Sequence, residues 1–591
     1  MIHSKGVNIN DSSPSLEPHF SLTASVNEIK VKKLIMDRFQ GEVSLNCLPR
    51  TSRIRHRTRH LLDSNSNVFN HGMELLRSRA KTEEADQKKT QSEGVKQRET
   101  PKATSTPSSS DDEWEKVNER GKGSGGSGTG SSQTRESSFE GVIGFFHPFC
   151  NAGGGGERLL FAAILATQRR YPNALCVVYT GDHDASKDQI LNNVRNRFNI
   201  ELNAARTCFL YLSTREYVLA SKWPHFTLLG QSIGSLILGW DAVNLLVPDV
   251  MIDTMGYAFV LALSKWLFPN LPTGAYVHYP TISTDMLSSL HTEVSSGQGL
   301  NAGLGKGTKG RAKQVYWELF AKLYSWVGGS VDVVMTNSSW TQNHVSTLWS
   351  PARKKRGKKK AISVVYPPCA VEELTAKIPV DAESERTRTR NLLYIAQFRP
   401  EKMHHVIIDA FNAFLKSYKH LIQDGPTPKL ILVGSVRDDH DEKRVYKLRL
   451  QTQEIKDHVQ FVVNAKWPQI LDFLKSSSVG VNGMWNEHFG IGVVEYQAAG
   501  LISVINDSGG PKADIVIDID GKPTGFRATT PEQFAAGFAE ALSLPADEAF
   551  AMRQRARKSS WRFSEQVFND AWTGHLETLV ELAGPQSKLR R

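Results

Sequence analysis

Cysteine is scarce in this sequence, and no two cysteines lie close together. The five in 591 residues are Cys47, Cys150, Cys176, Cys208 and Cys369. An odd number of widely spaced cysteines without a CxxC pair argues against a disulfide framework and gives no support to a zinc or redox centre. We therefore expect free thiols and a reducing compartment.

Long hydrophobic runs are absent as well. No stretch of about 18 apolar residues lacks a polar interruption, and the first residues have neither the apolar core nor the cleavage site of a signal peptide. The nearest candidates are residues 226–247, interrupted by Gln231 and Asp241 among others, and residues 255–268, which are too few to cross a bilayer. We expect each to form a buried helix or a helix in a membrane interface.

The basic charge of the chain is mostly local. Seven charges of the net +11 come from residues 353–360, which leaves +4 for the rest of the chain. The charge therefore gives little support to binding of nucleic acid. The run itself is typical of a solvated loop, of a contact with an anionic membrane surface, or of a nuclear import signal.

Residues 1–140 have few apolar positions after Lys81 and pass into a Gly/Ser tract at 121–132. Such a segment cannot bury enough surface to offset its ordering entropy, so we expect a disordered, low-complexity extension. Its basic cluster at 53–60 lacks interleaved aromatic residues and only weakly indicates contact with RNA or lipid.

From Gly141 onward, short apolar runs alternate with helical patterns. This alternation predicts an α/β fold with parallel sheets covered on both faces. We expect two Rossmann-like domains facing a cleft, at 141–376 and 377–565, followed by a C-terminal helix and tail at 566–591. The predicted strands are 142–146, 174–180, 206–212, 249–253, 273–278, 331–336 and 361–366, then 392–397, 430–433, 459–463, 478–481 and 502–505. The predicted helices include 159–170 and 314–327, with a mobile loop between residues 287 and 313.

Four consecutive glycines, Gly153, Gly154, Gly155 and Gly156, follow the first predicted strand. They fit neither GxGxxG nor GxxxxGK[ST], so a dinucleotide or P-loop site is not expected. Four glycines permit close backbone approach to a bulky or anionic ligand, although they also suit a flexible turn. His278 lies just past another strand, where open α/β sheets place ligand groups; a structural histidine is the alternative.

The segment 484–500 combines two carboxylates with a glycine-rich helix start. Glu487 precedes the predicted helix, and Glu495 lies inside it. The uncovered backbone N–H groups between them suit a diphosphate. In the alternative interpretation, Glu487 only caps the helix and Glu495 lies on a solvated face.

Other polar residues at strand ends of the second half complete a nucleotide-diphosphate site. Two cations and several glycine turns accompany the two carboxylates, and this is the composition that such a ligand requires. The predicted donor-binding residues are Arg399, Lys402, Gly434, Glu487, Phe489, Gly490, Ile491, Glu495, Ser508 and Gly509.

The chain resembles the retaining glycosyltransferases of the GT-B fold, in which two glutamates are separated by seven residues, as Glu487 and Glu495 are. Within that class it is most similar to the dolichol-pathway α-1,2-mannosyltransferases. The similarity covers about 141–585 and rests on FFHPFCNAGGGGER at 145–158, PHFTLLGQS at 224–232, VHYPTISTDML at 277–287, QFRPEK at 397–402 and MWNEHFGIGVVE at 484–495.

The resemblance implies an activity and a set of residue roles. A GDP-mannose-dependent enzyme would add the fourth and fifth mannoses to a dolichyl-diphosphate oligosaccharide at the cytosolic face of the endoplasmic reticulum membrane. His278 would act at the reacting centre, and the glycine loop would face the sugar or the acceptor. Glu487 would hold mannose hydroxyls and Glu495 the ribose, while Arg399 and Lys402 would neutralise the diphosphate.

The chain departs from its relatives at several positions. Gln397 stands where many relatives have the first cation, and Asp514 stands near a usual glutamate. Members of the family usually begin with a membrane-spanning anchor, whose place is taken here by residues 1–140. Attachment to a membrane surface is therefore expected from apolar stretches of the first domain and from the basic run, which resembles an insertion.

Retention without a suitably placed nucleophile indicates front-side displacement, and no cofactor or metal is expected because Arg, Lys and helix N–H groups would meet the diphosphate. Other dolichol-pathway mannosyltransferases are expected partners. One alternative is a GT-B transferase with another donor or linkage, which competition by GDP or UDP would distinguish. A remote alternative is a nucleic-acid-associated scaffold acting through residues 1–140, which salt-dependent RNA binding would support.

Overall fold

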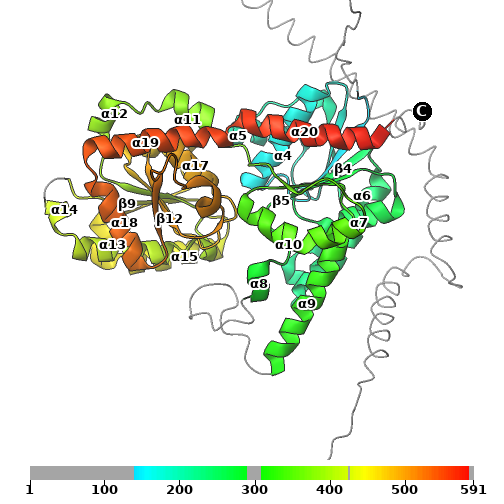
Figure 1. The fold of residues 1–591 in the computed structure, drawn as a ribbon, viewed down its shortest axis with the longest axis horizontal. Helices are drawn as coiled ribbons and strands as arrows, with labels where there is room; N and C mark the ends of the chain where they lie inside the picture. The colour runs from blue at the N-terminus through cyan, green and yellow to red at the C-terminus, as the bar shows by residue number, and fades with distance from the viewer. Residues whose placement is uncertain (1–138, 289–307, 424–425, 585–591) are drawn as a thin grey trace, which may run out of the picture. The chain divides into compact units, whose positions relative to one another are not determined.

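The computed structural model describes residues 139–288, 308–423 and 426–584 (Figure 1). The predicted N-terminal extension, its basic cluster and most of the predicted loop between 287 and 313 lie outside these residues. Four cysteines, Cys150, Cys176, Cys208 and Cys369, are free thiols, as expected.

The first domain contains a seven-stranded sheet in which every pair of neighbours is parallel. The strand order is β3-β2-β1-β4-β5-β6-β7. The strands are β1 (Val142–Phe146), β2 (Leu175–Thr180), β3 (Thr207–Tyr211), β4 (Val250–Asp253), β5 (Thr273–Val277), β6 (Val333–Thr336) and β7 (Ser363–Val364). The accompanying α-helices are α4 (Gly155–Arg170), α5 (Lys187–Phe198), α6 (Thr227–Leu245), α7 (Ala258–Leu267), α8 (Thr284–Ser288), α9 (Thr308–Gly328) and α10 (Ser339–Lys355).

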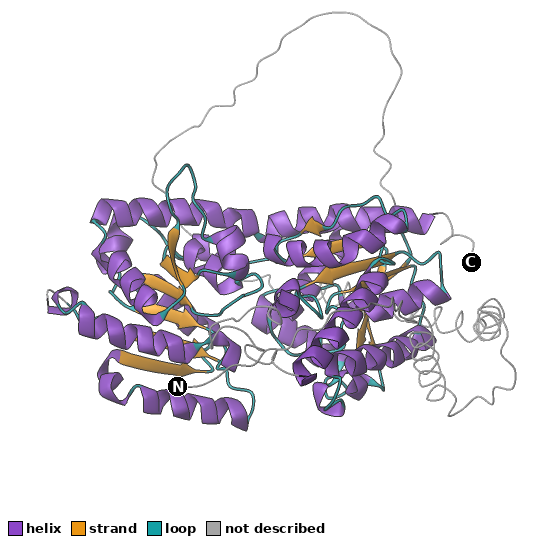
Figure 2. Cartoon of the chain, turned by 60° about the horizontal axis from the view of Figure 1, so that its bottom comes forward, coloured by secondary structure: helices purple, strands orange, loops and turns teal. Residues whose placement is uncertain are grey.

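Alternate side chains of β1 explain why this sheet is buried on both faces. Ile143 and Phe145 join one hydrophobic cluster, whereas Val142 and Phe146 join another. Successive side chains of a strand point to opposite faces, so helices must cover both sides. Figure 2 shows strands enclosed by helices in this way. The predicted parallel architecture is confirmed.

The second domain contains a six-stranded parallel sheet with the order β10-β9-β8-β11-β12-β13. Its strands are β8 (Leu392–Ile395), β9 (Leu430–Gly434), β10 (Val459–Val463), β11 (Val479–Asn482), β12 (Ile502–Asn506) and β13 (Gly525–Ala528). Its α-helices are α11 (Val371–Lys377), α12 (Ala382–Thr387), α13 (His404–Ser417), α14 (His420–Gln423), α15 (Asp439–Gln451), α16 (Trp467–Ser476), α17 (Ile491–Ala498), α18 (Pro531–Ser543) and α19 (Ala546–Ser560). Helix α11 packs into this domain's core through Val371 and Leu374, ahead of the predicted boundary at 377.

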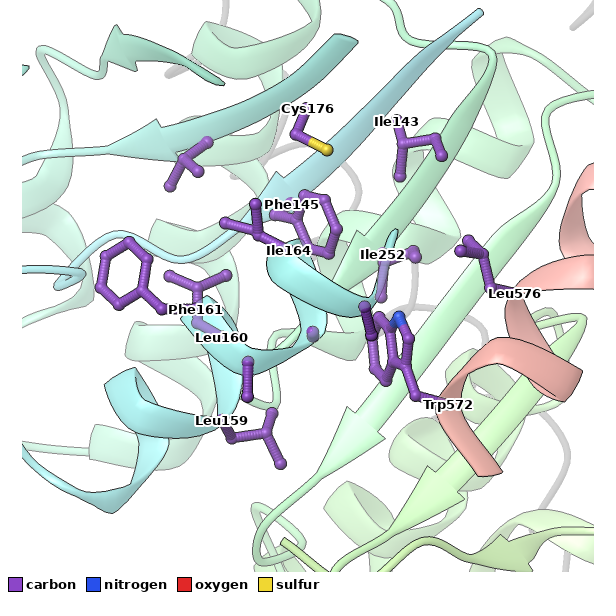
Figure 3. Packing of buried hydrophobic residues seen from close by; sticks show 14 of the residues in the cluster. Ile143, Phe145, Leu159, Leu160, Phe161, Ile164, Cys176, Ile252, Trp572 and Leu576 are labelled. Carbon is purple, nitrogen blue, oxygen red and sulfur yellow. The ribbon is translucent and has the colours of Figure 1, made fainter. Parts of the chain in front are cut away.

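The last helix, α20 (Glu565–Ala583), packs on the first domain although it follows the second in sequence. Trp572 and Leu576 enter the cluster that contains Phe145 (Figure 3). Arg158 pairs with Glu565 at 2.8 Å and Arg170 with Glu577 at 2.6 Å. Since both pairs are twelve residues apart along α4 and along α20, the two helices run parallel.

Two predicted segments differ from the structure. Helix α4 begins at Gly155, inside the glycine run, rather than at residue 159, and α9 begins at Thr308 within the predicted loop. In both cases the helix begins earlier in the chain than the first apolar residue from which its start was predicted.

The prediction of a solvated loop at 353–360 is wrong for part of the run. Helix α10 continues to Lys355, and the buried Arg353 donates to the carbonyls of Val331, Asp332 and Lys360. Lys358 pairs with the carboxylate of Asp332. Five of the seven basic side chains remain exposed: Lys354, Lys355, Arg356, Lys359 and Lys360.

The two apolar segments weighed as interfacial or buried form helices α6 and α7, which pack on each other and contribute to the core of the first domain. Among residues 139–288, 308–423 and 426–584, no helix combines the length and the hydropathy needed to cross a membrane.

Candidate active site

The glycine loop lies against two other predicted site elements. Gly153 has a φ of 79°, a conformation that favours glycine. A Cβ atom at Gly155 would lie 2.9 Å from Cδ1 of Ile491, at the start of α17, and one at Gly156 would lie 3.8 Å from Nε2 of His278. The absence of side chains at Gly155 and Gly156 therefore permits the glycine loop to approach both α17 of the second domain and His278 of its own domain.

His278 follows the carboxyl end of β5, as predicted. Its Nε2 lies 3.1 Å from the carbonyl oxygen of Thr254. Because a carbonyl only accepts, Nε2 carries the proton. Burial, together with the neighbouring His147, lowers the pKa of His278 to about 4. At neutral pH this imidazole is uncharged, and its Nδ1 can accept a hydrogen bond but supplies no positive charge.

Glu487 and Lys402 form a largely buried ion pair. The carboxylate Oε2 lies 2.5 Å from the ammonium Nζ, and the side chains are 15% and 22% exposed. Burial opposes ionisation of Glu487, but the charge and hydrogen bond of Lys402 outweigh it and hold the pKa of Glu487 below its usual value. The sequence had assigned the two residues to separate parts of the donor, whereas the structure brings them into contact.

Arg399 faces a different set of charges. Its guanidinium lies 3.9 Å from Glu401. Burial and the neighbouring Arg437 lower the pKa of Arg399, and the acidic groups that oppose this shift include Asp438 and Asp441, at the start of α15. Of the two predicted cations, Lys402 is therefore the one that contacts Glu487.

Ser508 and Gly509 pack against the loop that carries Glu487. The backbone N–H of Asn486 donates to Oγ of Ser508 at 2.7 Å. A Cβ atom at Gly509 would collide with the backbone of Glu487. These predicted donor-binding residues fix the backbone around Glu487 in the structure.

Helix α17 begins with uncovered backbone N–H groups, as predicted. Its N-cap is Gly490, with φ of 103°, and no side chain caps this described helix, so the alternative of Glu487 as the cap is wrong. Phe489 is buried against Phe563 and Tyr366, which anchors the turn. Among the residues that the structure describes, no side chain therefore competes with an anion for the N–H groups of Ile491 and Gly492 at the positive end of α17.

Glu495 lies in α17 near Arg158 of the first domain. Burial raises the pKa of Glu495; Arg158 opposes the rise and Glu373 adds to it. The side chain is half-buried, so the interpretation that it lies on a solvated face is wrong. A desolvated carboxylate of this kind suits hydroxyl donors such as those of a ribose.

Gly434, at the end of β9, is required by packing. A Cβ atom there would collide with the carbonyl of Ala396 at the end of the neighbouring strand. Beyond it lies a pocket of about 300 Å³, lined by Val436, Arg437, Asp438, Asp439, Glu442, Val445, Val463 and Asn464. Several of these residues follow strand ends, which is where ligands of open α/β sheets lie.

Contacts from the first domain hold the Glu487 loop, and sequence reasoning missed them. His488 stacks on Tyr279, with ring centroids 4.2 Å apart and planes 11° apart, and Trp340 stacks on both rings at 5.8 Å. The hydroxyl of Ser338 donates to the carbonyl of His488 at 2.6 Å. Tyr279 directly follows His278, so the stack joins the neighbours of the two predicted catalytic residues.

Asp514 reinforces this junction. Its carboxylate accepts the backbone N–H of Ser339 at 2.8 Å and the hydroxyl of Tyr366 at 3.1 Å. Asn486 donates to Asp285 at 2.9 Å. No local pattern indicates these pairs, because their members lie more than 140 residues apart along the chain.

Replacing His488 by alanine should reduce kcat/KM for the reaction at this site by roughly 5- to 30-fold, since each aromatic pair contributes ~0.5–1.5 kcal/mol beyond its burial. His488→Phe should retain most of the activity because it keeps the stack. His183→Ala is the control, since it removes a histidine whose ring lies at a tilt of 39° to that of a tyrosine, Tyr211, with centroids 5.6 Å apart. Steady-state kinetics of the three variants test this; equal activity of His488→Ala and wild type would contradict it.

Two parallel-sheet domains with a diphosphate-suited helix start and paired carboxylates define a glycosyltransferase of the GT-B class. Residues 380–559 match the family described as Glycosyl transferases group 1. A glycosyltransferase from Rickettsia africae superposes with a TM-score of 0.50 at 14% identity, covering 76% of this chain and 99% of that one. An alpha,alpha-trehalose 6-phosphate synthase from Burkholderia multivorans does so with 0.51 at 13% identity, covering 76% and 100%.

Residues 140–349 match the family described as ALG11 mannosyltransferase N-terminus. A Neurospora crassa protein named GDP-Man:Man(3)GlcNAc(2)-PP-Dol alpha-1,2-mannosyltransferase is 62% identical over 457 residues, covering 76% of this chain and 81% of that protein. The Homo sapiens protein of the same name is 43% identical over 459 residues, covering 76% and 89%. The chain belongs to this family of alpha-1,2-mannosyltransferases, and the resemblance predicted from the sequence is confirmed.

Proposed function

We propose that this chain transfers mannose from GDP-mannose, in α-1,2 linkage, to dolichyl-diphosphate-linked Man(3)GlcNAc(2), and adds the fourth and fifth mannoses of the oligosaccharide. The observation that carries this proposal is the Glu487–Lys402 pair beside the open start of α17, close to the glycine loop. Family membership supplies the donor and the acceptor, since the relatives are named for both.

In the proposed reaction the bond between mannose C1 and the GDP phosphate breaks as a bond to the acceptor oxygen forms on the same face. The departing phosphate takes the proton of the acceptor hydroxyl, so the configuration at C1 is retained. Lys402 and the N–H groups of α17 stabilise the charge that develops on the phosphate. Neutral His278, whose Nε2–H donates to Thr254, can orient a hydroxyl by accepting its hydrogen bond at Nδ1, and Glu487 and Glu495 hold mannose and ribose hydroxyls.

The donor is tested by competition. GDP should inhibit transfer from labelled GDP-mannose at concentrations at which UDP does not, because the proposed site is built for a GDP-sugar. Inhibition by UDP together with transfer from a UDP-sugar would favour the alternative, a GT-B enzyme with another donor.

We expect transfer to be insensitive to metal chelation. Lys402 and the helix N–H groups supply the positive charge that a divalent ion would otherwise bring to the diphosphate. The measurement compares initial rates with and without excess EDTA, with addition of Mg²⁺ or Mn²⁺ afterwards. Loss of activity in EDTA and recovery on adding a metal would contradict this mechanism.

The reaction is proposed to take place at the cytosolic face of the endoplasmic reticulum membrane, with α9 in contact with the lipid. One side of this helix carries Val315, Leu319, Leu323 and Trp326, which are 55%, 59%, 37% and 60% exposed. Their spacing places them on one face. Arg356 lies 5.0 Å above the ring of Trp326, and the exposed part of the basic run follows. Interfacial tryptophan beside cations favours an anionic lipid surface.

Flotation with liposomes tests this contact. The chain should float with vesicles that contain anionic lipid and much less with neutral vesicles. Leu319→Glu combined with Leu323→Glu should abolish flotation, whereas Leu450→Glu, at an exposed leucine of α15, should not. Equal flotation of the α9 variant and the control would remove α9 from the membrane contact.

A further inference from the structure

A carboxylate and an imidazole are buried together beneath the glycine loop, and neither has a role in the reaction described so far. Glu157 lies in the first turn of α4 and is 7% exposed, and His147 follows β1 and is fully buried. Oε1 of Glu157 lies 3.5 Å from Nε2 of His147. Burying two ionisable groups is costly unless they satisfy each other, so the pair calls for a reason.

Capping of α4 accounts for only half of this arrangement. Oε2 of Glu157 accepts the backbone N–H of Gly154, the N-cap residue. A cap needs only that oxygen, whereas the other one is directed to His147. Burial opposes ionisation of Glu157, but His147 and the Gly154 N–H outweigh it and hold the pKa of Glu157 below its usual value. The carboxylate is therefore charged at neutral pH and only accepts hydrogen bonds.

The contacts of His147 continue toward His278. Nδ1 of His147 lies 2.8 Å from Oγ1 of the fully buried Thr254. The carbonyl of the same threonine accepts Nε2–H of His278 at 3.1 Å. A continuous chain of contacts thus runs from the backbone of the glycine loop, through Glu157 and His147, to the residue that fixes the ring of His278.

We propose that Glu157, His147 and Thr254 are positioning residues that hold the glycine loop and His278 in one mutual arrangement for mannosyl transfer. The inference rests on the proposed function, because it assigns the loop and His278 to the same reaction. The three side chains act through the loop and His278, and no proton has to move along the chain. Their contribution is orientation, which is lost when a link is removed even if the fold is kept.

Kinetics of two substitutions at Thr254 test one link of the relay, which is the chain of contacts from Glu157 through His147 to Thr254. Thr254→Val removes the hydroxyl but keeps the carbonyl and the approximate shape, whereas Thr254→Ser restores the hydroxyl. We expect Thr254→Val to lower kcat about tenfold or more, with the KM for GDP-mannose within about threefold of wild type, and Thr254→Ser to recover most of kcat. Recovery by serine separates the hydroxyl from the packing of the methyl group.

Thr167→Val is the matched control. Thr167 is equally buried in α4, and its hydroxyl donates to the carbonyl of Ala163 and accepts from the indole of Trp572. This variant should lower Tm, as the loss of a buried hydroxyl requires, but leave kcat unchanged. A Thr254→Val variant with a kcat within twofold of wild type would overturn the relay, as would equal loss of kcat in both valine variants.

Hydrogen exchange of the full-length protein tests the relay without the reaction. Glu157→Gln keeps the size of the side chain but removes its charge and replaces one of its two acceptor oxygens by an NH2 donor. The peptide that spans 151–158 should exchange faster in Glu157→Gln and in Thr254→Val than in wild type, and it should be unchanged in Thr167→Val. Equal exchange in all four proteins would overturn the relay. If the variants show these exchange differences but the wild type transfers no mannose, the proposed function is contradicted instead.

Discussion

Glu487→Ala should lower kcat/KM for mannosyl transfer by roughly 30- to 1,000-fold, which corresponds to ~2–4 kcal/mol of transition-state stabilisation. The carboxylate is the partner of Lys402 at 2.5 Å, and both side chains are mostly removed from solvent. Its removal takes away the proposed acceptor for mannose hydroxyls and leaves the ammonium of Lys402 without its counter-charge.

Two further variants make this result specific. Glu487→Gln keeps the size of the side chain and loses the charge, so it should fall between wild type and Glu487→Ala. Glu454→Ala removes an exposed glutamate of the same domain that pairs with Lys416 at 3.5 Å, and it should transfer mannose normally. Initial rates at several donor concentrations are measured for all proteins; a Glu487→Ala rate within twofold of wild type would show that this carboxylate has no role in the reaction.

Trp572→Ala should destabilise the protein by ~3–5 kcal/mol, the usual range for truncating a buried aromatic residue. Trp572 is 1% exposed, stacks on Phe145 and Phe568, and donates from its indole nitrogen to Oγ1 of Thr167 at 3.2 Å. Figure 3 shows its ring inserted from α20 among side chains of the first sheet and α4. Its loss opens a cavity in the core of the first domain.

Thermal unfolding measures this effect. Trp572→Ala should lower Tm by roughly 10 °C for a domain of this size. Trp561→Ala is the control, since that tryptophan is 44% exposed and its truncation should leave Tm nearly unchanged. Coincident unfolding curves for Trp572→Ala and wild type would mean that α20 does not stabilise the first domain.

The strands of both sheets were predictable because most are buried on both faces and therefore read as apolar runs. VIGFF at β1 is buried at every position. The last strand, β13, was not predicted, because its sequence GFRA contains a glycine and an arginine and resembles a loop. It pairs with β12 through the backbone, and a short edge strand of this kind needs little apolar sequence of its own.

The basic run shows where local sequence is misleading. Seven cations in eight residues indicate a solvated loop, yet Arg353 and Lys358 are fixed by groups at Val331 and Asp332. Those partners lie more than twenty residues earlier in the sequence. Charge patterning detects the cations, but only the fold shows which of them are neutralised.

Part of the candidate site could likewise be predicted from the sequence and part could not. The glycine loop and the segment from Glu487 to Glu495 are contiguous, so their chemistry was visible in the sequence. The contacts between His147 and Thr254 and between Ser338 and His488 join residues 107 and 150 positions apart, and no pattern in one sequence reports such pairs. Single-sequence reasoning therefore finds the groups that meet a ligand more readily than those that orient them.

The most direct test of the proposed function is transfer of labelled mannose from GDP-mannose to a lipid-linked Man(3)GlcNAc(2) acceptor, followed by digestion of the product with an α-1,2-mannosidase. We predict a product with two added mannoses, both released by the mannosidase. A product that resists the mannosidase would contradict the proposed function. So would an enzyme that transfers sugar only to another acceptor or only from another donor.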